Sequence, residues 1–250
     1  MKYTAKFFRE SLPSWKRKKD PLIAQWIYRP ISFYISAFCA NNNISANTVS
    51  YFSISIAIIA CVLFYFPYDI FHLWGAIFVN IWLLFDCVDG NIARGVKKLH
   101  FGEFADATSS YILIAFLYTA IGYAVYIDGG ILFTSNNIWI VICGAIASTT
   151  DVLMRLIHHK YLEGERKFFE QTGYKISTEN INDEKDHGIK GRIKESLSIG
   201  GYLPILILIA TIWHFLDIVV LYCLLQSMGL FLILTTKSII KTIEINKEIG

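Results

Sequence analysis

Three aspartates lie at ordered spacing in a stretch of the chain that is otherwise apolar. They are Asp86, Asp89 and Asp106, and Ser110 follows the last of them by four residues. An ionised carboxylate at the depth of a lipid bilayer costs several kcal/mol, so three together need a partner of opposite charge. Carboxylate oxygens suit Mg²⁺ or Mn²⁺, and such ions commonly take part of their coordination from substrate phosphates. The spacing therefore predicts a divalent-metal site that acts on a phosphorylated substrate.

Helix periodicity predicts how these side chains meet. Residues three or four apart share one face of a helix, so Asp86 and Asp89 face one side, as do Asp106 and Ser110. We expect a turn that contains Gly90 and Gly102 to join two antiparallel helices. Their polar faces would then form one cluster of carboxylate oxygens at a membrane surface.

Small and basic residues surround the acids. Gly90 and Ala93 leave room for a flat or bulky group to approach the backbone. Arg94, Lys97 and Lys98 add positive charge. The alternative interpretation is that the carboxylates only neutralise these basic residues at a membrane interface.

The composition indicates a polytopic membrane protein. Of 250 residues, 54% are hydrophobic and only 17% charged, whereas a soluble domain carries about a quarter charged residues. Apolar runs long enough to cross a bilayer recur. We predict an all-α bundle of six spans, at 47–66, 70–89, 105–127, 137–158, 197–213 and 216–236. The modest net charge of +3 gives no reason to expect nucleic acid as a partner.

The distribution of Lys and Arg predicts the orientation. Segments 1–46 and 159–195 carry eight each, and three lie in 90–103 and three after 236, with Arg155 near the inner end of its span. The loops on the opposite side carry none. Basic residues are retained in the cytoplasm, so we expect both termini and the aspartate cluster to be cytoplasmic, in a bacterial cytoplasmic membrane.

The predicted spans divide the chain into three parts. Residues 1–46 form a basic juxtamembrane segment, and we expect amphipathic helices to hold it in the membrane interface. The basic residues from Lys16 to Lys19 would pair with anionic headgroups. A disordered basic tail is the alternative, because Pro13 interrupts any long helix. Residues 47–240 form the membrane domain, with a solvated loop at 160–195 that holds one short helix near 161–170. Residues 241–250 form a cytoplasmic tail.

The segment 86–110 resembles the signature of the CDP-alcohol phosphotransferase family. That signature reads Asp-x-x-Asp-Gly-x-x-Ala-Arg, then Gly-x-x-x-Asp-x-x-x-Asp, and the chain matches every fixed position except the last, which is Ser110. The six-span layout and the lead-in from Ile44 to Ser50 are also similar to the family. The resemblance therefore covers most of the chain.

The resemblance implies a fold, a reaction and roles for residues. Members bind a CDP-alcohol with one or two divalent metals, and an acceptor attacks the phosphate of the donor alcohol so that CMP leaves. Donor and acceptor would be a CDP-alcohol and a lipid, an alcohol or a polyprenyl phosphate, and the protein would be a homodimer. The residue roles carried over by position are metal ligation by Asp86, Asp89 and Asp106, a cytidine border at Gly90, Ala93 and Gly102, and support of the phosphates by Arg94.

Ser110 departs from the pattern where the family has the aspartate that takes the proton from the acceptor. A hydroxyl is a poor base and a weak ligand. Four interpretations stay open: an acceptor that is already ionised, such as a polyprenyl phosphate; a relocated base; a base that was never indispensable; or lost catalysis. Asp151 and Arg155, four residues apart on the fourth predicted span, are candidates for base and phosphate contact, and Glu103 is another. Asp151 and Arg155 could equally be a buried ion pair.

Two other classes of function compete with a transferase. An ion or solute transporter would carry acids near the bilayer midplane along a route to both sides, whereas these acids gather at one face. A protein that binds a cytidine nucleotide or a lipid without turnover is the third reading. Within the transferase reading, phospholipid synthesis and surface-glycan synthesis both fit.

Overall fold

The computed structural model describes residues 2–173 and 199–249, and within these ranges the regular structure is entirely helical. The N-terminal elements are α1 (Ala5–Ser11), α2 (Ser14–Lys19), the π-helix η1 (Ala24–Tyr28) and α3 (Arg29–Asn41). The remaining elements are α4 (Ala46–Leu63), α5 (Asp69–Gly95), α6 (Gly102–Asp128), α7 (Ile138–Thr172), α9 (Leu203–Ile212) and α10 (Leu216–Ile249). The predicted all-α membrane class is confirmed.

Five of these helices, α4, α5, α6, α7 and α10, are long and apolar enough to cross a membrane. Their positions agree with five of the six predicted spans. The remaining predicted span, 197–213, corresponds in the described residues to α9, which has 10 residues. At 1.5 Å per residue α9 is about 15 Å long, half the thickness of a bilayer core. The six-span layout therefore consists of five long helices and one short apolar helix.

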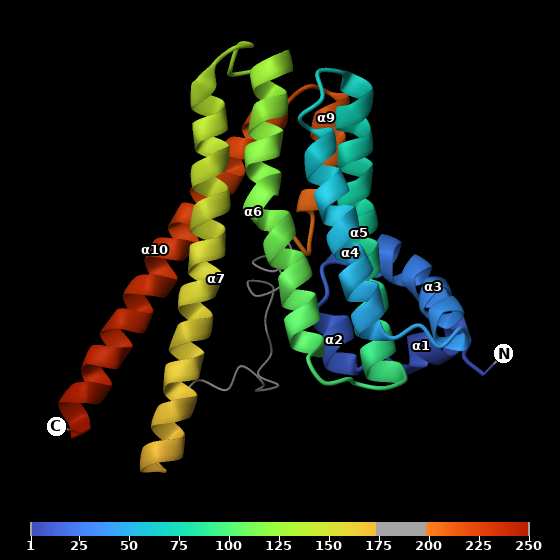
Figure 1. The fold of residues 1–250 in the computed structure, drawn as a ribbon, viewed down its shortest axis with the longest axis vertical. Coiled ribbons are helices and arrows are strands. Elements are labelled where there is room, and N and C mark those ends of the chain that lie inside the picture. The colour runs from blue at the N-terminus through green and yellow to red at the C-terminus, as the bar shows by residue number, and fades with distance from the viewer. Residues whose placement is uncertain (1, 174–198, 250) are drawn as a thin grey trace.

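The long helices form a bundle with two distinct ends (Figure 1). At the lower end, called here the site end, α5 connects to α6. At the upper end, called the far end, α4 connects to α5 and α6 to α7. Helix α4 packs against α5 and α6, α7 packs against α6 and α10, and α9 packs against α5. The N-terminal helices lie beside the site end, and α10 also terminates there, so both termini are at the end that holds the aspartates.

Local signals in the sequence set several helix boundaries. Ser45 begins α4 as its N-cap and accepts a hydrogen bond from the Thr48 amide at 3.1 Å, as its residue type predicts. Asn137 caps α7 in the same way. Gly129 has φ of 82° just after α6, a conformation that glycine adopts without strain. These capped ends place the start of α4 and the end of α6.

Small residues let α6 and α7 approach closely. A Cβ atom built on Gly144 of α7 would lie 2.3 Å from the carbonyl oxygen of Tyr118. A Cβ on Gly122 of α6 would lie 2.8 Å from the carbonyl oxygen of Ile140. The two backbones are thus in contact through glycines, as is common between membrane helices.

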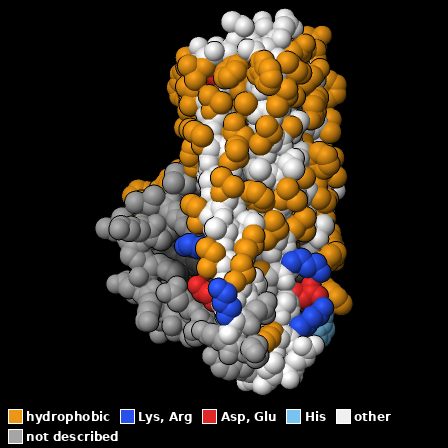
Figure 2. All heavy atoms as spheres, turned by 90° about the vertical axis from the view of Figure 1, so that its left-hand side faces the viewer, with side chains coloured by type: hydrophobic (Ala, Val, Ile, Leu, Met, Phe, Trp, Pro, Cys, Tyr) orange, Lys and Arg blue, Asp and Glu red, His pale blue; other side chains and the backbone are white. Residues whose placement is uncertain are grey.

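The surface agrees with a membrane environment. Figure 2 shows the face formed by α7 and α10, where hydrophobic side chains cover the upper part and charged side chains gather in the lower part. The ion pairs in the second half of α7 include Lys160 with Glu163 at 2.7 Å and Lys167 with Glu163 at 2.8 Å. The apolar part is consistent with lipid contact, and the charged part with water or headgroups.

Two predicted boundaries differ from the structure. The short helix expected near 161–170 is the continuation of α7, which runs unbroken to Thr172 and ends at Gly173 with φ of 67°. Residues 174–195 of the predicted loop lie outside the described residues. The turn between α5 and α6 is shorter than predicted, because α5 continues to Gly95 and Gly90 lies inside the helix.

Candidate active site

The structure brings the aspartates of α5 and α6 together at the site end. Asp86 and Asp89 lie in the C-terminal part of α5, and Asp106 lies in the first turns of α6. The carboxylates of Asp86 and Asp106 interact directly across the two helices. Asp89 is within electrostatic range of both and is only 7% exposed, whereas Asp106 is open to solvent. The acids therefore form a partly buried cluster with an open side.

Asp89 is held from a third helix. Its Oδ2 accepts a hydrogen bond from the Ser50 hydroxyl of α4 at 2.6 Å, and Ser50 is itself buried. The bond helps to fix the orientation of this buried carboxylate, which the backbone of Gly90 also contacts. Sequence reasoning missed this role, although Ser50 ends the lead-in that resembles the family.

A chain of buried polar groups links α4, α5 and α6 behind the acids. The hydroxyls of Ser53 and Ser109 lie 2.6 Å apart, and the Trp82 indole N–H donates to Ser109 at 2.8 Å. Ser53 also donates to the carbonyl of Ser50 at 2.7 Å. Because each of these buried groups is satisfied only in one arrangement, the network fixes the register of the three helices.

Gly90 and Arg94 lie together on α5, one turn apart. A Cβ atom on Gly90 would be 2.8 Å from Nη2 of Arg94, so the guanidinium covers the bare backbone of Gly90. Arg94 is also within electrostatic range of Asp89 and Asp106. Ala93 faces a different side and packs against the small apolar cluster around Val49, beside α4. Arg94 thus borders the acids and occupies the space beside Gly90.

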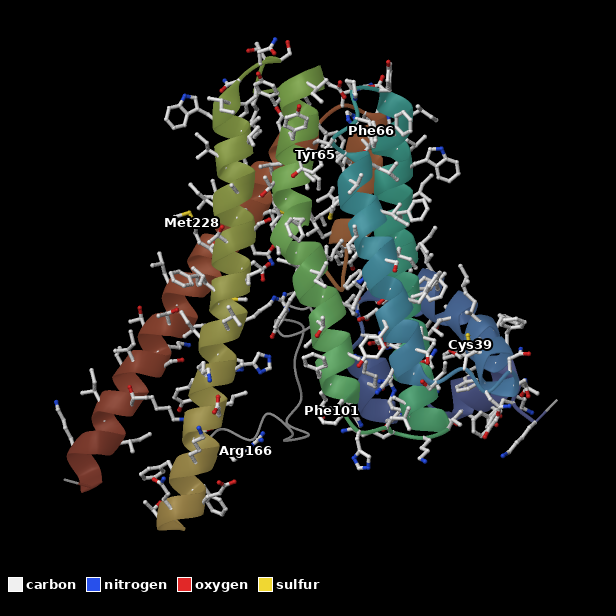
Figure 3. All side chains as sticks on the ribbon, viewed as in Figure 1. Cys39, Tyr65, Phe66, Phe101, Arg166 and Met228 are labelled. Atoms are coloured by element: carbon white, nitrogen blue, oxygen red, sulfur yellow. The ribbon has the colours of Figure 1, made fainter. Side chains whose placement is uncertain are left out.

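The connection between α5 and α6 is held by Asn47. The Asn47 side-chain amide donates to the carbonyl of His100 at 3.0 Å. Phe101 follows with φ of 61°, and Gly102 then begins α6, with Asn47 Oδ1 3.4 Å from where its Cβ would be. Phe101 is exposed and lies at the site end, whereas Tyr65 and Phe66 lie at the far end (Figure 3). Asn47 thus positions the loop that leads to Asp106.

Ser110 makes its hydrogen bond within its own helix. Its hydroxyl donates to the backbone carbonyl of Asp106 at 3.2 Å. A serine that bonds the carbonyl four residues earlier is a common feature of membrane helices. In this arrangement its proton does not point to any carboxylate of the cluster.

Asp151 and Arg155 of α7 form an ion pair with each other. Arg155 Nε lies 2.8 Å from Asp151 Oδ1, and the Tyr118 hydroxyl donates to Asp151 Oδ2 at 3.3 Å. The pair borders a small cavity between α6, α7 and α10. Within the described residues these bonds do not include the aspartates of α5 and α6. Tyr111 connects the two groups, since it is in electrostatic range of both Arg155 and Asp106.

A second buried ion pair anchors the N-terminal segment beneath the acids. Arg29 Nε lies 2.7 Å from Asp20 Oδ2, and Arg29 also donates to the Asn91 side chain of α5 at 2.9 Å. Both residues are buried: Asp20 is 3% exposed and Arg29 is 6% exposed. Lys16 lies 3.2 Å from Asp20 and within electrostatic range of Asp86 and Asp106. The segment predicted to lie on the membrane surface therefore also contacts the site.

The pKa of Asp20 reflects this pairing. Burial raises the pKa of the carboxyl, but the hydrogen bond and charge of Arg29, together with Lys16, outweigh burial and lower it below the usual value. Asp20 therefore stays ionised in the folded protein. The sequence contains a signal for this ion pair: Arg29 is the one Lys or Arg between residues 20 and 93, and a lone arginine in an apolar stretch needs a partner of opposite charge.

The donor set fits a divalent cation. Asp86 and Asp106 place two like charges in contact, and such a pair is stable only if a proton or a cation lies between them. Oxygen donors of this kind, open on one side to a substrate, are typical of Mg²⁺ and Mn²⁺ sites. A different group of potential metal ligands lies at the far end of the bundle. Within the described residues, the ligand atoms of Asp69, His72 and Asp128 converge there to within 4.8 Å of one another.

Comparison with known proteins gives one result for the whole membrane domain. The family model described as CDP-alcohol phosphatidyltransferase matches residues 43–236, which is most of the chain. The comparison with curated proteins gives no match. The matched range includes the aspartates, Ser50, Arg94 and the Asp151–Arg155 pair.

Proposed function

Since this chain belongs to the CDP-alcohol phosphatidyltransferase family, a phosphotransferase family of membrane proteins, we propose that it moves a substituted phosphate from a CDP-alcohol to a lipid, alcohol or polyprenyl-phosphate acceptor. The observation that carries the proposal is the contact of Asp86 with Asp106 from two helices, with Asp89 beside them. The pathway would be phospholipid or surface-glycan synthesis.

The chain's own residues bind and orient the donor. Asp86, Asp89 and Asp106 would hold Mg²⁺ or Mn²⁺, which when bound neutralises the diphosphate and stabilises the leaving CMP. Arg94 is placed to contact a phosphate, and Gly90, Ala93 and Gly102 would border the cytidine. Ser50 keeps the Asp89 carboxylate in one orientation. The open side of Asp106 is where donor and acceptor would enter.

The reaction exchanges one P–O bond for another. The acceptor oxygen forms a bond to the phosphorus that carries the donor alcohol, and the bond from that phosphorus to the oxygen of CMP breaks. A hydroxyl acceptor must also release a proton, and Ser110 is no base for it. An acceptor phosphate is already ionised at neutral pH, so no base is needed, and we favour this acceptor for the chain. Arg155 would then bind the acceptor phosphate while Asp151 orients the guanidinium.

The first test is CMP release by the purified protein. The donors are CDP-glycerol, CDP-ribitol, CDP-ethanolamine, CDP-choline and CDP-diacylglycerol, each with Mg²⁺ or Mn²⁺ and with or without polyprenyl phosphate and lipid alcohols. We expect metal-dependent release from one donor, and a loss of at least about 100-fold in Asp89→Asn and Asp106→Asn. Glu163→Gln, an exposed change on α7, is the matched control. Full activity of the aspartate variants would remove the metal assignment.

Ser110→Asp tests the choice of acceptor. If the acceptor is ionised, an added carboxylate repels it, and we expect release with polyprenyl phosphate to fall about 10-fold. A large gain with hydroxyl acceptors would show an ordinary member of the family that lacks its base. Nucleotide binding without CMP release from any donor would instead favour a protein that binds its ligand without turnover. The hydrogen bond of Ser110 within its own helix is also compatible with that function.

A further inference from the structure

A second group of metal-ligating side chains lies at the far end of the bundle. Asp69 is the first residue of α5, His72 follows one turn later, and Asp128 is the last residue of α6. One ligand atom from each lies within 4.8 Å of the other two. His72 Nδ1 is 2.8 Å from Asp128 Oδ2. The three groups come from two helices, at the opposite end from Asp86, Asp89 and Asp106 (Figure 1).

The charges at this end do not balance. The chain has no Lys or Arg between residues 30 and 93, 104 and 154, or 199 and 236, so these helices bring no permanent cation to the two acids. Asp128 also sits at the C-terminus of α6, where the helix dipole is negative and disfavours an anion. Asp69 begins α5, where the dipole favours an anion, so only Asp128 is in an unfavourable position. Two adjacent carboxylates are stable only with a proton or a cation between them.

A nearby acid shows what a satisfied carboxylate looks like in this region. Asp217 is completely buried and accepts hydrogen bonds from the backbone amides of Leu132, Phe133 and Ile218. Backbone donors therefore neutralise Asp217, and it needs no cation. Asp69 and Asp128 have no comparable set of backbone donors within the described residues, where the partners of Asp128 are His72 and the Asp69 carboxyl.

His72 is the unusual member of the group. The side chain is buried, with 1% of the residue exposed, and Nε2 has no hydrogen-bond partner among the described residues. The imidazole lines a cavity of about 10 Å³, room for about one water-sized body, together with Asp69, Asp128, Thr211 and His214. Nδ1 is the ring nitrogen that faces Asp128, and Nε2 lies on the other edge of the ring, so an ion between the acids and the ring would be held through Nδ1. The cavity, the acids and this ring thus point to one small cationic ligand.

We propose that Asp69, His72 and Asp128 form a site for a zinc-like divalent cation, separate from the catalytic aspartates. A histidine nitrogen combined with carboxylate oxygens is a ligand set that Zn²⁺ favours, whereas Mg²⁺ and Ca²⁺ favour oxygen alone. His214, in the loop before α10, is on the cavity wall from which a fourth ligand would come. The bound ion would join the start of α5 to the end of α6.

The test uses Zn²⁺ with the full-length protein in nanodiscs. Equilibrium dialysis against Zn²⁺, followed by metal analysis, gives the number of ions bound per chain. To disable the proposed catalytic metal site in the measurement, two of its three aspartates are replaced in the background, Asp89→Asn with Asp106→Asn. We expect one Zn²⁺ per chain to remain in that background, and at least 10-fold weaker binding after adding Asp128→Asn or Asp69→Asn. Asp217→Asn would not serve as a control, because its buried carboxylate holds a loop, so Glu163→Gln is used instead.

A second measurement separates a metal from a proton. Co²⁺ in place of Zn²⁺ gives visible absorption bands whose intensity reports coordination by nitrogen and oxygen, and these bands should disappear in His72→Gln and in Asp128→Asn. Zn²⁺ should also raise the unfolding temperature of the background protein but not of its Asp128→Asn derivative. No stoichiometric Zn²⁺, or binding that Asp69→Asn and Asp128→Asn leave unchanged, would overturn the proposal and identify His72–Asp128 as a proton-mediated ion pair. Because two of the three aspartates of the proposed catalytic site are replaced in the background, either result is independent of the proposed transferase activity.

Discussion

At the level of single residues, the orientation of the Asp89 carboxylate depends on Ser50. Removing the hydroxyl in Ser50→Ala leaves Asp89 buried without its 2.6 Å donor and less firmly oriented. Loss of a group that orients a metal ligand typically weakens metal binding 10–100-fold. We expect Ser50→Ala to need about 10-fold more Mg²⁺ or Mn²⁺ for half-maximal CMP release, with a smaller change in rate at saturating metal.

The control for Ser50→Ala is Ser55→Ala, since Ser55 is on the same helix but exposed. Ser55→Ala should leave the metal titration unchanged. If both variants give the wild-type curve, the Ser50 hydroxyl does not position a metal ligand, and the aspartate cluster works without support from α4.

The residues of the site differ in how far the sequence reveals them. Asp86, Asp89 and Asp106 could be found because carboxylates in an apolar stretch are rare and their spacing is regular. Ser50 could not be recognised in the same way, because its partner is 39 residues away on another helix. Arg94 was expected beside the phosphates, but its position over Gly90 depends on a side-chain conformation that no spacing determines.

At the level of elements, the buried pair of Asp20 and Arg29 connects the N-terminal segment to α5. Asp20→Asn would leave the Arg29 guanidinium buried beside Asn91 with no opposite charge. Removing one member of a buried ion pair costs about 3–5 kcal/mol. We expect a clearly lower unfolding temperature at pH 7 and faster proteolysis within the first 30 residues. Glu10→Gln breaks an exposed pair with Lys6 and should change neither measurement.

Acid should reproduce part of the Asp20→Asn effect. The folded-state pKa of Asp20 is lowered from its usual 3.8, so its stabilising contribution is present above about pH 4 and is lost as the pH falls through the folded-state pKa. The wild type should therefore approach the stability of Asp20→Asn below that pH, as followed by thermal unfolding between pH 7 and pH 3. A constant difference between the two proteins across this range would contradict the role of the ionised carboxyl.

The helices themselves were largely predictable, and the exceptions have physical causes. The apolar run at 47–66 located the start of α4 to within one residue and its end to within three, because hydropathy is a local signal. Hydropathy could not show that α9 is only 10 residues long, since a short buried helix is as apolar as a membrane span. The continuation of α7 beyond the membrane was missed because polarity was taken as the end of the helix, whereas exposed ion pairs at helical spacing, such as Lys160 with Glu163, support a helix in water.

For the molecule as a whole, the two ends of the bundle differ in charge. The site end carries the catalytic acids, Lys16, Arg29 and Arg94, while the far end carries Asp69, Asp128 and Asp217 without Lys or Arg. A transferase that uses a CDP-alcohol needs its site on the side where the nucleotide is made, and basic residues are retained on that same side. Both arguments predict that the site end faces the cytoplasm. The proposed zinc-like ion would then be bound outside.

Cysteine labelling in intact bacterial cells tests this orientation. The five native cysteines are free, four buried and Cys143 partly exposed, and are first replaced by alanine or serine. Ser135→Cys then places one thiol in the exposed loop between α6 and α7, and Lys98→Cys places one in the exposed loop between α5 and α6. A membrane-impermeant maleimide should label Ser135→Cys in intact cells and Lys98→Cys only after permeabilisation. The reverse pattern would place the aspartates outside, away from cytosolic CDP-alcohols, and the proposed reaction could not proceed with that donor.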